Sequence, residues 1–156
     1  MGARRPGRWP MIGFFDAVVA RLADPNRCPA VVQAAVAMDA ERTIETLALG
    51  ADVSAIVSPL SDEATPIRSA GLRVSQVETW IFGVTMALVF PGGFAQWDVA
   101  RVQIKAALCG WTPEGAARPV EYAGGTLLEY RAEEGGRWLH LLRFRVDVQE
   151  TYGAQS

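Results

Sequence analysis

Residues 126–148 read TLLEYRAEEGGRWLHLLRFRVDV, two runs of alternating side chains separated by a glycine-containing segment. Alternation predicts strands with one face in the core, and two such runs around residues 134–136 predict a β-hairpin. A three-residue turn places Tyr130 opposite His140, and a slip by one residue would move every side chain to the wrong face. The apolar face of the second strand is expected to hold Trp138, His140, Leu142, Phe144, Val146 and Val148.

The rest of the chain mixes helical and extended patterns. Apolar residues recur every three or four positions over 12–23 and 96–109, which predicts two amphipathic helices. Asp39 is expected to cap a short helix over 40–49. We therefore predict an α+β fold: a mostly antiparallel mixed sheet with two to three helices packed on it and a C-terminal β-hairpin. The upstream strands are predicted at 30–38, 53–59 and 74–90.

Two of these elements are apolar on both sides. The 74–90 run stays apolar on both faces beyond Trp80, which indicates a central strand covered on both faces, and Gly83 is expected to mark a bulge or bend in it. The 96–109 helix has a second apolar arc, so it is either deeply buried or covers a neighbouring subunit. That arc consists of Val99, Val102, Ala106 and Cys109.

The segment 61–72 is polar and contains Pro66 and Gly71. We expect a loop, and a connection of this length is either mobile or engaged with a partner. Its adjacent acids Asp62 and Glu63 are expected to be solvated turn charges, with a hard cation as the alternative. The candidate partner-facing residues are Asp62, Glu63, Arg68 and Arg73.

Length, composition and charge limit the classes of protein to which this chain can belong. The chain has 156 residues, half of them apolar, with a formal net charge of −2 and a sequence pI near 5.4. We expect one domain over 11–152, preceded by a flexible basic extension at 1–10 that is either native or upstream of a true start at Met11, and followed by a tail at 153–156. No apolar run is long enough to span a membrane, and no basic cluster indicates general nucleic-acid binding. We expect a cytoplasmic protein with reduced thiols.

Cys28, Cys109 and the single histidine, His140, are the obvious chemical candidates. Their spacing forms neither a CxxC pair nor a zinc knuckle, so we expect no metal and no cofactor. Cys109 is predicted to end a helix, where the negative end of the dipole disfavours a thiolate. His140 is expected to be a core or cross-strand residue rather than a general base. No catalytic residue is predicted, and the chain is not expected to be an enzyme.

The second face of the hairpin mixes charged and apolar side chains. Such a face is either a solvated sheet surface or an interface of the kind that builds rings. The candidate interface residues are Glu129, Arg131, Leu139, Leu141, Arg143 and Arg145.

The order of these elements resembles the tail terminator, or tail completion, family of long-tailed bacteriophages, prophages and gene transfer agents. The resemblance extends from about Met11 to Tyr152, with the predicted helices and strands in the order that the family shows. The residues that carry it are Ala107-Leu108-Cys109-Gly110-Trp111-Thr112-Pro113, Gly124-Gly125-Thr126-Leu127-Leu128, Trp138 and Phe144.

The resemblance implies a virion assembly protein. Such proteins form a hexameric ring at the neck end of the tail, halt polymerisation of the tail tube and provide the surface on which the head docks. The implied partners are further copies of the same chain, the tail tube protein and head–tail connector proteins, with DNA only as passing cargo and no membrane. Assembly would take place in the host cytoplasm.

Two alternatives remain open at the level of sequence. One is a neck or connector protein that contacts DNA in the channel, and salt-dependent DNA binding would favour it. The other is a small α/β ligand-binding or hydrolase domain, which requires a pocket with convergent polar groups.

Overall fold

The computed structural model describes residues 11–50, 52–66, 68–70, 73–89 and 94–153. The predicted basic extension at 1–10 and most of the predicted tail lie outside these residues, while Gly153 ends the last strand. The described helices are α1 (Met11–Ala23), α2 (Ala40–Glu45) and α3 (Phe94–Leu108), with a 3-10 turn at Ala132–Glu134. The strands are β1 (Val31–Val36), β2 (Val53–Ala64), β3 (Arg68–Ala70), β4 (Arg73–Leu88), β5 (Glu121–Arg131) and β6 (Arg137–Gly153).

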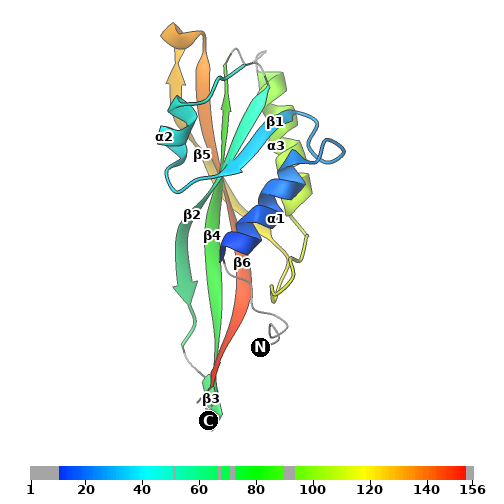
Figure 1. Cartoon of the computed structure of the whole chain (residues 1–156), viewed down its shortest axis with the longest axis vertical. Coiled ribbons are helices and arrows are strands. Elements are labelled where there is room, and N and C mark those ends of the chain that lie inside the picture. Colours follow the sequence, from blue (N-terminus) through cyan, green and yellow to red (C-terminus); the bar gives the residue numbers. More distant parts are fainter. Residues whose placement is uncertain (1–10, 51, 67, 71–72, 90–93, 154–156) are drawn as a thin grey trace, which may run out of the picture.

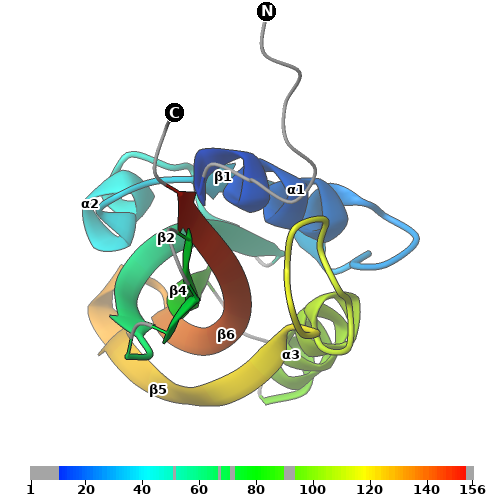
Figure 2. The ribbon, with the colours of Figure 1, turned by 90° about the horizontal axis from the view of Figure 1, so that it is seen from below.

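The strands form one mixed, six-stranded sheet in the order β1-β2-β4-β6-β5, with β3 paired to β4. β1 lies parallel to β2, and the other pairs are antiparallel. The sheet is strongly curved, so that β5 wraps beside β6 when the molecule is viewed along its long axis (Figure 2). The predicted α+β class, with a mostly antiparallel mixed sheet and a C-terminal hairpin, is confirmed.

Helices cover both faces of the sheet. On one face, Phe14 of α1 and Ile104 of α3 join a core that contains Phe82 of β4, and these three side chains are at most 1% exposed. On the other face, α2 contributes the buried Ile44 to a smaller cluster with Leu139. β4 is therefore covered on both faces, as the two-sided apolar pattern predicts.

The covered part of the molecule occupies only one end of the sheet. We call this helix-covered part the body. Figure 1 shows β2, β4 and β6 running on past the helices to β3 and the C-terminal end. We call this extension the arm: residues 61–66, 68–70, 73–79 and 147–153. Among the arm side chains that the structure describes, only Val148, where the arm joins the body, is fully buried.

The predicted loop over 61–72 is wrong for residues 61–64 and 68–70, which belong to strands. Thr65 and Pro66 lie between those strands, and residues 67, 71 and 72 fall outside the part of the chain that the structure describes. β2 shifts register between Pro59 and Ser61 and then continues to Ala64, which lies opposite Glu78 of β4. β3 adds a short pairing, with Arg68 opposite Ser75. The polar composition of this segment reflects exposed strands rather than a connection, because no helix covers it and polar side chains on both faces meet solvent.

The predicted hairpin register is also wrong. Tyr130 lies opposite Trp138 rather than His140. The connection is longer than three residues, because the 3-10 turn at Ala132–Glu134 is followed by two glycines with positive φ before Arg137 pairs with Arg131. A further register shift in β5 leaves Leu128 without a paired residue. The apolar face predicted for β6 is nevertheless correct, since face membership depends only on alternation within that strand.

Helix α2 is shorter than predicted. The Asp39 carboxylate accepts a hydrogen bond from the Arg42 amide at 3.0 Å, which confirms the N-cap. The helix ends at Glu45, and the Thr46 hydroxyl donates to the Thr43 carbonyl at 2.7 Å, one of the acceptors left free at a helix end. Leu47 and Leu49 then pack against the smaller core cluster instead of extending the helix.

Gly83 does not mark a bulge in β4, which pairs with β6 in unbroken register. The irregularity lies in the neighbouring strand, between Pro59 and Ser61. A Cβ atom on Gly83 would lie 2.6 Å from Leu141 Cδ1 and 3.2 Å from Leu60 Cδ1. A larger residue there would require one of these two leucine side chains to move.

Helix α3 ends at Leu108, one residue before the predicted end at Cys109. Gly110 follows the helix with φ of 81°, the left-handed position that glycine favours. Trp111 stacks on Phe14 of α1 at 6.2 Å between ring centroids, and the Arg21 guanidinium lies 4.4 Å from its ring. Arg21 also donates to the Ala107 carbonyl at 2.7 Å. The Gly-Trp sequence thus joins the end of α3 to α1.

Candidate assembly surfaces

The predicted interface residues share one face of the sheet. The β5–β6 pairing puts Glu129 opposite Leu139, and alternation places Leu141, Arg143 and Arg145 on that side too. This is the face that α2 covers in the body. Leu139 is 1% exposed and Leu141 7%, so the chain itself already covers both side chains. An interface on this face has to use the side chains around them.

Several charges on this face are paired within the chain. Glu129 forms ion pairs with Arg131 and with Arg137, the latter at 3.7 Å. At the other end of β5, Arg145 lies 3.8 Å from Glu121. The Arg145–Glu121 pair is exposed on both sides, and a pair of that kind contributes little to folding. Together, these charges make the hairpin surface mixed in sign rather than strongly basic or acidic.

A shallow groove opens beside α2 on the same face. It has a volume of about 330 Å³. Its apolar lining includes Met38, which is 83% exposed, together with Leu60 and Leu128, 42% and 37% exposed. Its charged lining residues are Asp39 and Glu41. Sequence reasoning missed the groove because its walls come from five separated parts of the chain, although the bulged Leu128 and the small Gly83 mark its position.

The outer side of α3 is a second apolar surface. Val99 and Val102 are 50% and 55% exposed, and Ala95 and Ala106 are exposed beside them. The opposite side of the helix is buried in the core through Ala100, Ile104 and Leu108. The predicted second apolar arc of α3 is therefore confirmed for Val99, Val102 and Ala106, which no other part of the described chain covers, whereas its fourth predicted member, Cys109, packs against the core.

The arm carries the predicted partner-facing residues. Asp62 and Glu63 are exposed on β2, Arg68 lies in β3 and Arg73 begins β4. The structure thus brings these positions together in one projecting element, although as strand residues rather than loop residues.

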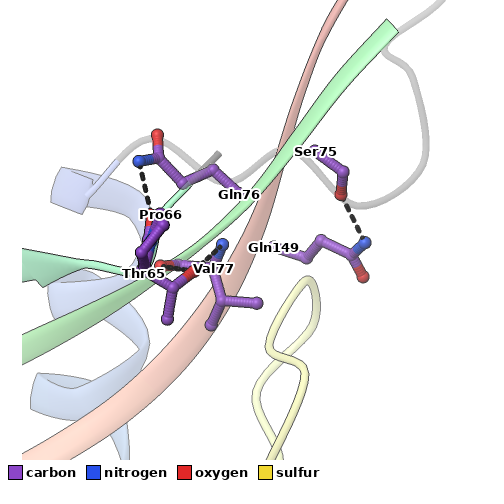
Figure 3. A pocket seen from close by; sticks show the side chains of 6 residues that line it. All are labelled: Thr65, Pro66, Ser75, Gln76, Val77 and Gln149. Carbon is purple, nitrogen blue, oxygen red and sulfur yellow. Dashed lines mark hydrogen bonds between the residues drawn. The ribbon is translucent and has the colours of Figure 1, made fainter. Parts of the chain in front are cut away.

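A polar recess of about 310 Å³ lies in the arm (Figure 3). Thr65 exchanges hydrogen bonds with Val77 across it, its amide donating to the Val77 carbonyl at 2.9 Å and its hydroxyl accepting from the Val77 amide at 3.2 Å. Gln76 donates to the Thr65 carbonyl at 2.8 Å, and Gln149 donates to the Ser75 hydroxyl at 2.9 Å. The lining residues are uncharged, so the recess offers no group for acid–base chemistry. Its hydrogen bonds instead connect neighbouring segments of the arm.

The thiols are in environments that disfavour thiolate. Burial and the nearby Asp24 carboxylate raise the pKa of Cys28 to about 11. Burial also raises the pKa of Cys109, outweighing the opposing effect of Lys105. Because a nucleophilic cysteine needs a lowered pKa, neither environment favours covalent catalysis.

His140 is packed among aromatic rings, as the core or cross-strand prediction requires. Its ring meets Trp97 edge-on at 5.0 Å, and Trp97 stacks on Trp138 at 6.0 Å. Burial, followed by the nearby Arg101 charge, lowers the pKa of His140.

Metal sites and membrane-spanning helices were considered for the described part of the chain. No group of three or more His, Cys, Asp or Glu side chains there is arranged to hold a metal ion. Among the described helices, none is long and apolar enough to cross a membrane.

No protein-family model and no curated protein matches this chain. A search of solved structures finds a similar chain in a structure entitled "Virion of native gene transfer agent (GTA) particle". The similarity has a TM-score of 0.50, covers 85% of this chain and 92% of that chain, and comes with 18% sequence identity. At this identity the likeness establishes a shared fold.

Proposed function

We propose that this chain is a virion structural protein that assembles as a ring on the end of a tail tube, stops its polymerisation and provides the surface to which the head docks. The observation that carries the proposal is the fold shared with a chain of a gene transfer agent virion, over 85% of this chain and 92% of that chain. The sequence resemblance to tail terminators supports the finer assignment to the neck end of the tail.

The surfaces of the chain suit a protein that works by assembly. The outer arc of α3 and the groove beside α2 expose apolar side chains, and such patches are typical of protein interfaces. The arm projects beyond the body and offers polar strands to a partner (Figure 1). In this proposal the body contacts neighbouring copies, while the arm reaches the tube or the connector. The role needs no catalytic group, cofactor or metal.

The test is polymerisation of the cognate tail tube protein in the presence and absence of the purified chain. Negative-stain images should show ring-shaped caps and shorter tubes when the chain is present, and solution mass should reveal an oligomer of several subunits. A chain that stays monomeric and never caps tubes would sink the proposal. In the producing cell, deletion of the gene should give overlong or headless tails, and normal particles would refute the assignment.

The same preparation separates the terminator from a neck protein that grips DNA. Binding to a short DNA duplex is measured by fluorescence anisotropy over a range of salt concentrations. The net charge of −2 predicts weak binding. Tight binding that falls steeply with salt would move the assignment to a connector in contact with the DNA channel.

A further inference from the structure

The outer side of α3 has the composition of a buried surface. Its exposed row is Ala95, Val99, Val102 and Ala106, small or β-branched side chains at helical spacing. A helix with apolar arcs on two sides is normally covered on both, yet the described chain covers this one on its sheet side alone. The small side chains also permit another surface to approach the helix closely.

The groove beside α2 has the complementary shape and character. It is concave, whereas α3 presents a convex ridge, and its exposed lining includes Met38, Leu60 and Leu128. Methionine is flexible and adapts to the shape of an incoming surface. The mouth of the groove is thus apolar and adjustable.

The charges favour pairing between these two surfaces over pairing of either with itself. The charged residues that line the groove are the acids Asp39 and Glu41. α3 carries Asp98 but also Arg101 and Lys105, which lie over the ring of Tyr122 at 5.7 Å and 4.1 Å. Two grooves brought together would juxtapose like charges, whereas the three charged side chains of α3 sum to +1, and Lys105 lies one helical turn from Val102.

The two surfaces lie on opposite sides of the sheet in the same end of the molecule (Figure 1, Figure 2). A contact between two different surfaces of one chain is heterologous, and repeated copies of such a contact close into a ring when the rotation permits. A self-complementary contact would stop at a dimer.

From these observations we infer that α3 of one copy packs into the groove beside α2 of the next copy, and that this contact builds the ring. The inference rests on the proposed function for the role of the ring, but the contact itself can be measured on the isolated chain. The ridge residues Val99 and Val102 meet the groove residues Met38, Leu60 and Leu128. The basic end of α3 lies toward the acidic rim.

The test uses two single variants, Val102→Glu on the ridge and Met38→Glu in the groove. Both side chains are exposed, so circular dichroism and thermal melting should match the wild type. Burying an unpaired carboxylate in the contact should weaken self-association by at least about 100-fold in either variant. Val32→Glu, at a 64% exposed position on β1, is the matched control and should assemble normally.

Mixing the two variants gives the decisive measurement. Each variant retains one intact surface, so an equimolar mixture should form heterodimers that cannot grow, with twice the monomer mass by light scattering. Rings from either variant alone, a mixture that remains monomeric, or an equal loss in Val32→Glu would overturn the assignment.

Failure of the inference and failure of the proposed function give different results. If wild-type rings form through this contact but never cap tail tubes, the contact stands and the tail role fails. If both variants still form rings that cap tubes, the tail role stands and the contact is wrong. A wild-type chain that is monomeric at every concentration and inert toward tubes would overturn both.

Discussion

The body and the arm are built on the same strands but bury different side chains. Within β4, Phe82, Val84 and Met86 are fully buried in the body, whereas Gln76 and Val77 are half-buried in the arm. The pairing of β4 with β6 continues without a break through both parts. Backbone hydrogen bonds can therefore extend a sheet beyond its core, while the free energy of unfolding depends mainly on the part that helices cover.

The largest predicted effect of a single substitution is in the body. Phe82 stacks on Phe144 at 5.6 Å between centroids and meets Phe14 edge-on at 5.2 Å. Phe82→Ala should lower the free energy of unfolding by about 3 to 5 kcal/mol, because a cavity forms where the rings meet. Urea denaturation measures this, with Val77→Ala in the arm as the control on the same strand. Equal losses would contradict the division between body and arm.

The next largest effect is expected at Gly83, in the part of β4 beneath the groove. Gly83→Ala would place a methyl group 2.6 Å from Leu141 Cδ1. The leucine has to move, at a cost of about 1 to 2 kcal/mol in unfolding free energy. In the double variant with Leu141→Ala the two costs should be less than additive, which a double-mutant cycle measures. Full additivity would mean that the two residues do not meet.

The difference between the body and the arm also explains which helices and strands can be predicted from the sequence. In the body, side chains that face the core recur at regular spacing, so the sequence reveals the helices and strands. The apolar stripe of α1 and the apolar residues on both faces of β4 are examples. In the arm, the strand residues are not buried by helices, so their sequence shows no regular apolar pattern. Ser61 to Glu63 therefore look like a loop, although they pair with β4. The hairpin register fails for a related reason, because a 3-10 turn and a bulge add residues that alternation does not reveal.

Of the two candidate assembly surfaces, one can be recognised in the sequence and the other cannot. The outer arc of α3 is visible in the sequence because a single helix carries it. The groove is invisible because Met38, Leu60 and Leu128 come from different segments and meet only in the fold. Leu139 belongs to the predicted interface by sequence, yet α2 covers it, and a helix as short as α2 gives no sign of which strand it will cover.

A smaller effect is predicted from the pH dependence of the body. The pKa of His140 is lowered by burial, so the unfolded chain binds a proton more readily than the folded one. Its neutral form stabilises the fold fully above the unfolded pKa of about 6.5, and this contribution is lost as pH falls from there through the folded pKa. The urea midpoint should drop between pH 8 and pH 5.5. His140→Gln should flatten this slope, and an unchanged slope would show that other groups cause it.

The smallest effect on folding is predicted in the arm. Gln76→Ala removes the hydrogen bond to the Thr65 carbonyl, and both residues are solvent-accessible. Water replaces the lost donor, so the free energy of unfolding should change by no more than about 0.5 kcal/mol. Hydrogen exchange should nevertheless speed up in residues 61–64 and not in the body strands.

Tube capping tests whether this local loosening matters for function. Under the proposed role of the arm, Gln76→Ala should still form rings through the body but cap tail tubes less efficiently. Thr46→Ala, which removes an exposed hydrogen bond in the body, is the matched control and should cap normally. If Gln76→Ala caps as well as the wild type although exchange in the arm is faster, an ordered arm is not needed for capping, and the contact with the tube must be sought on the body.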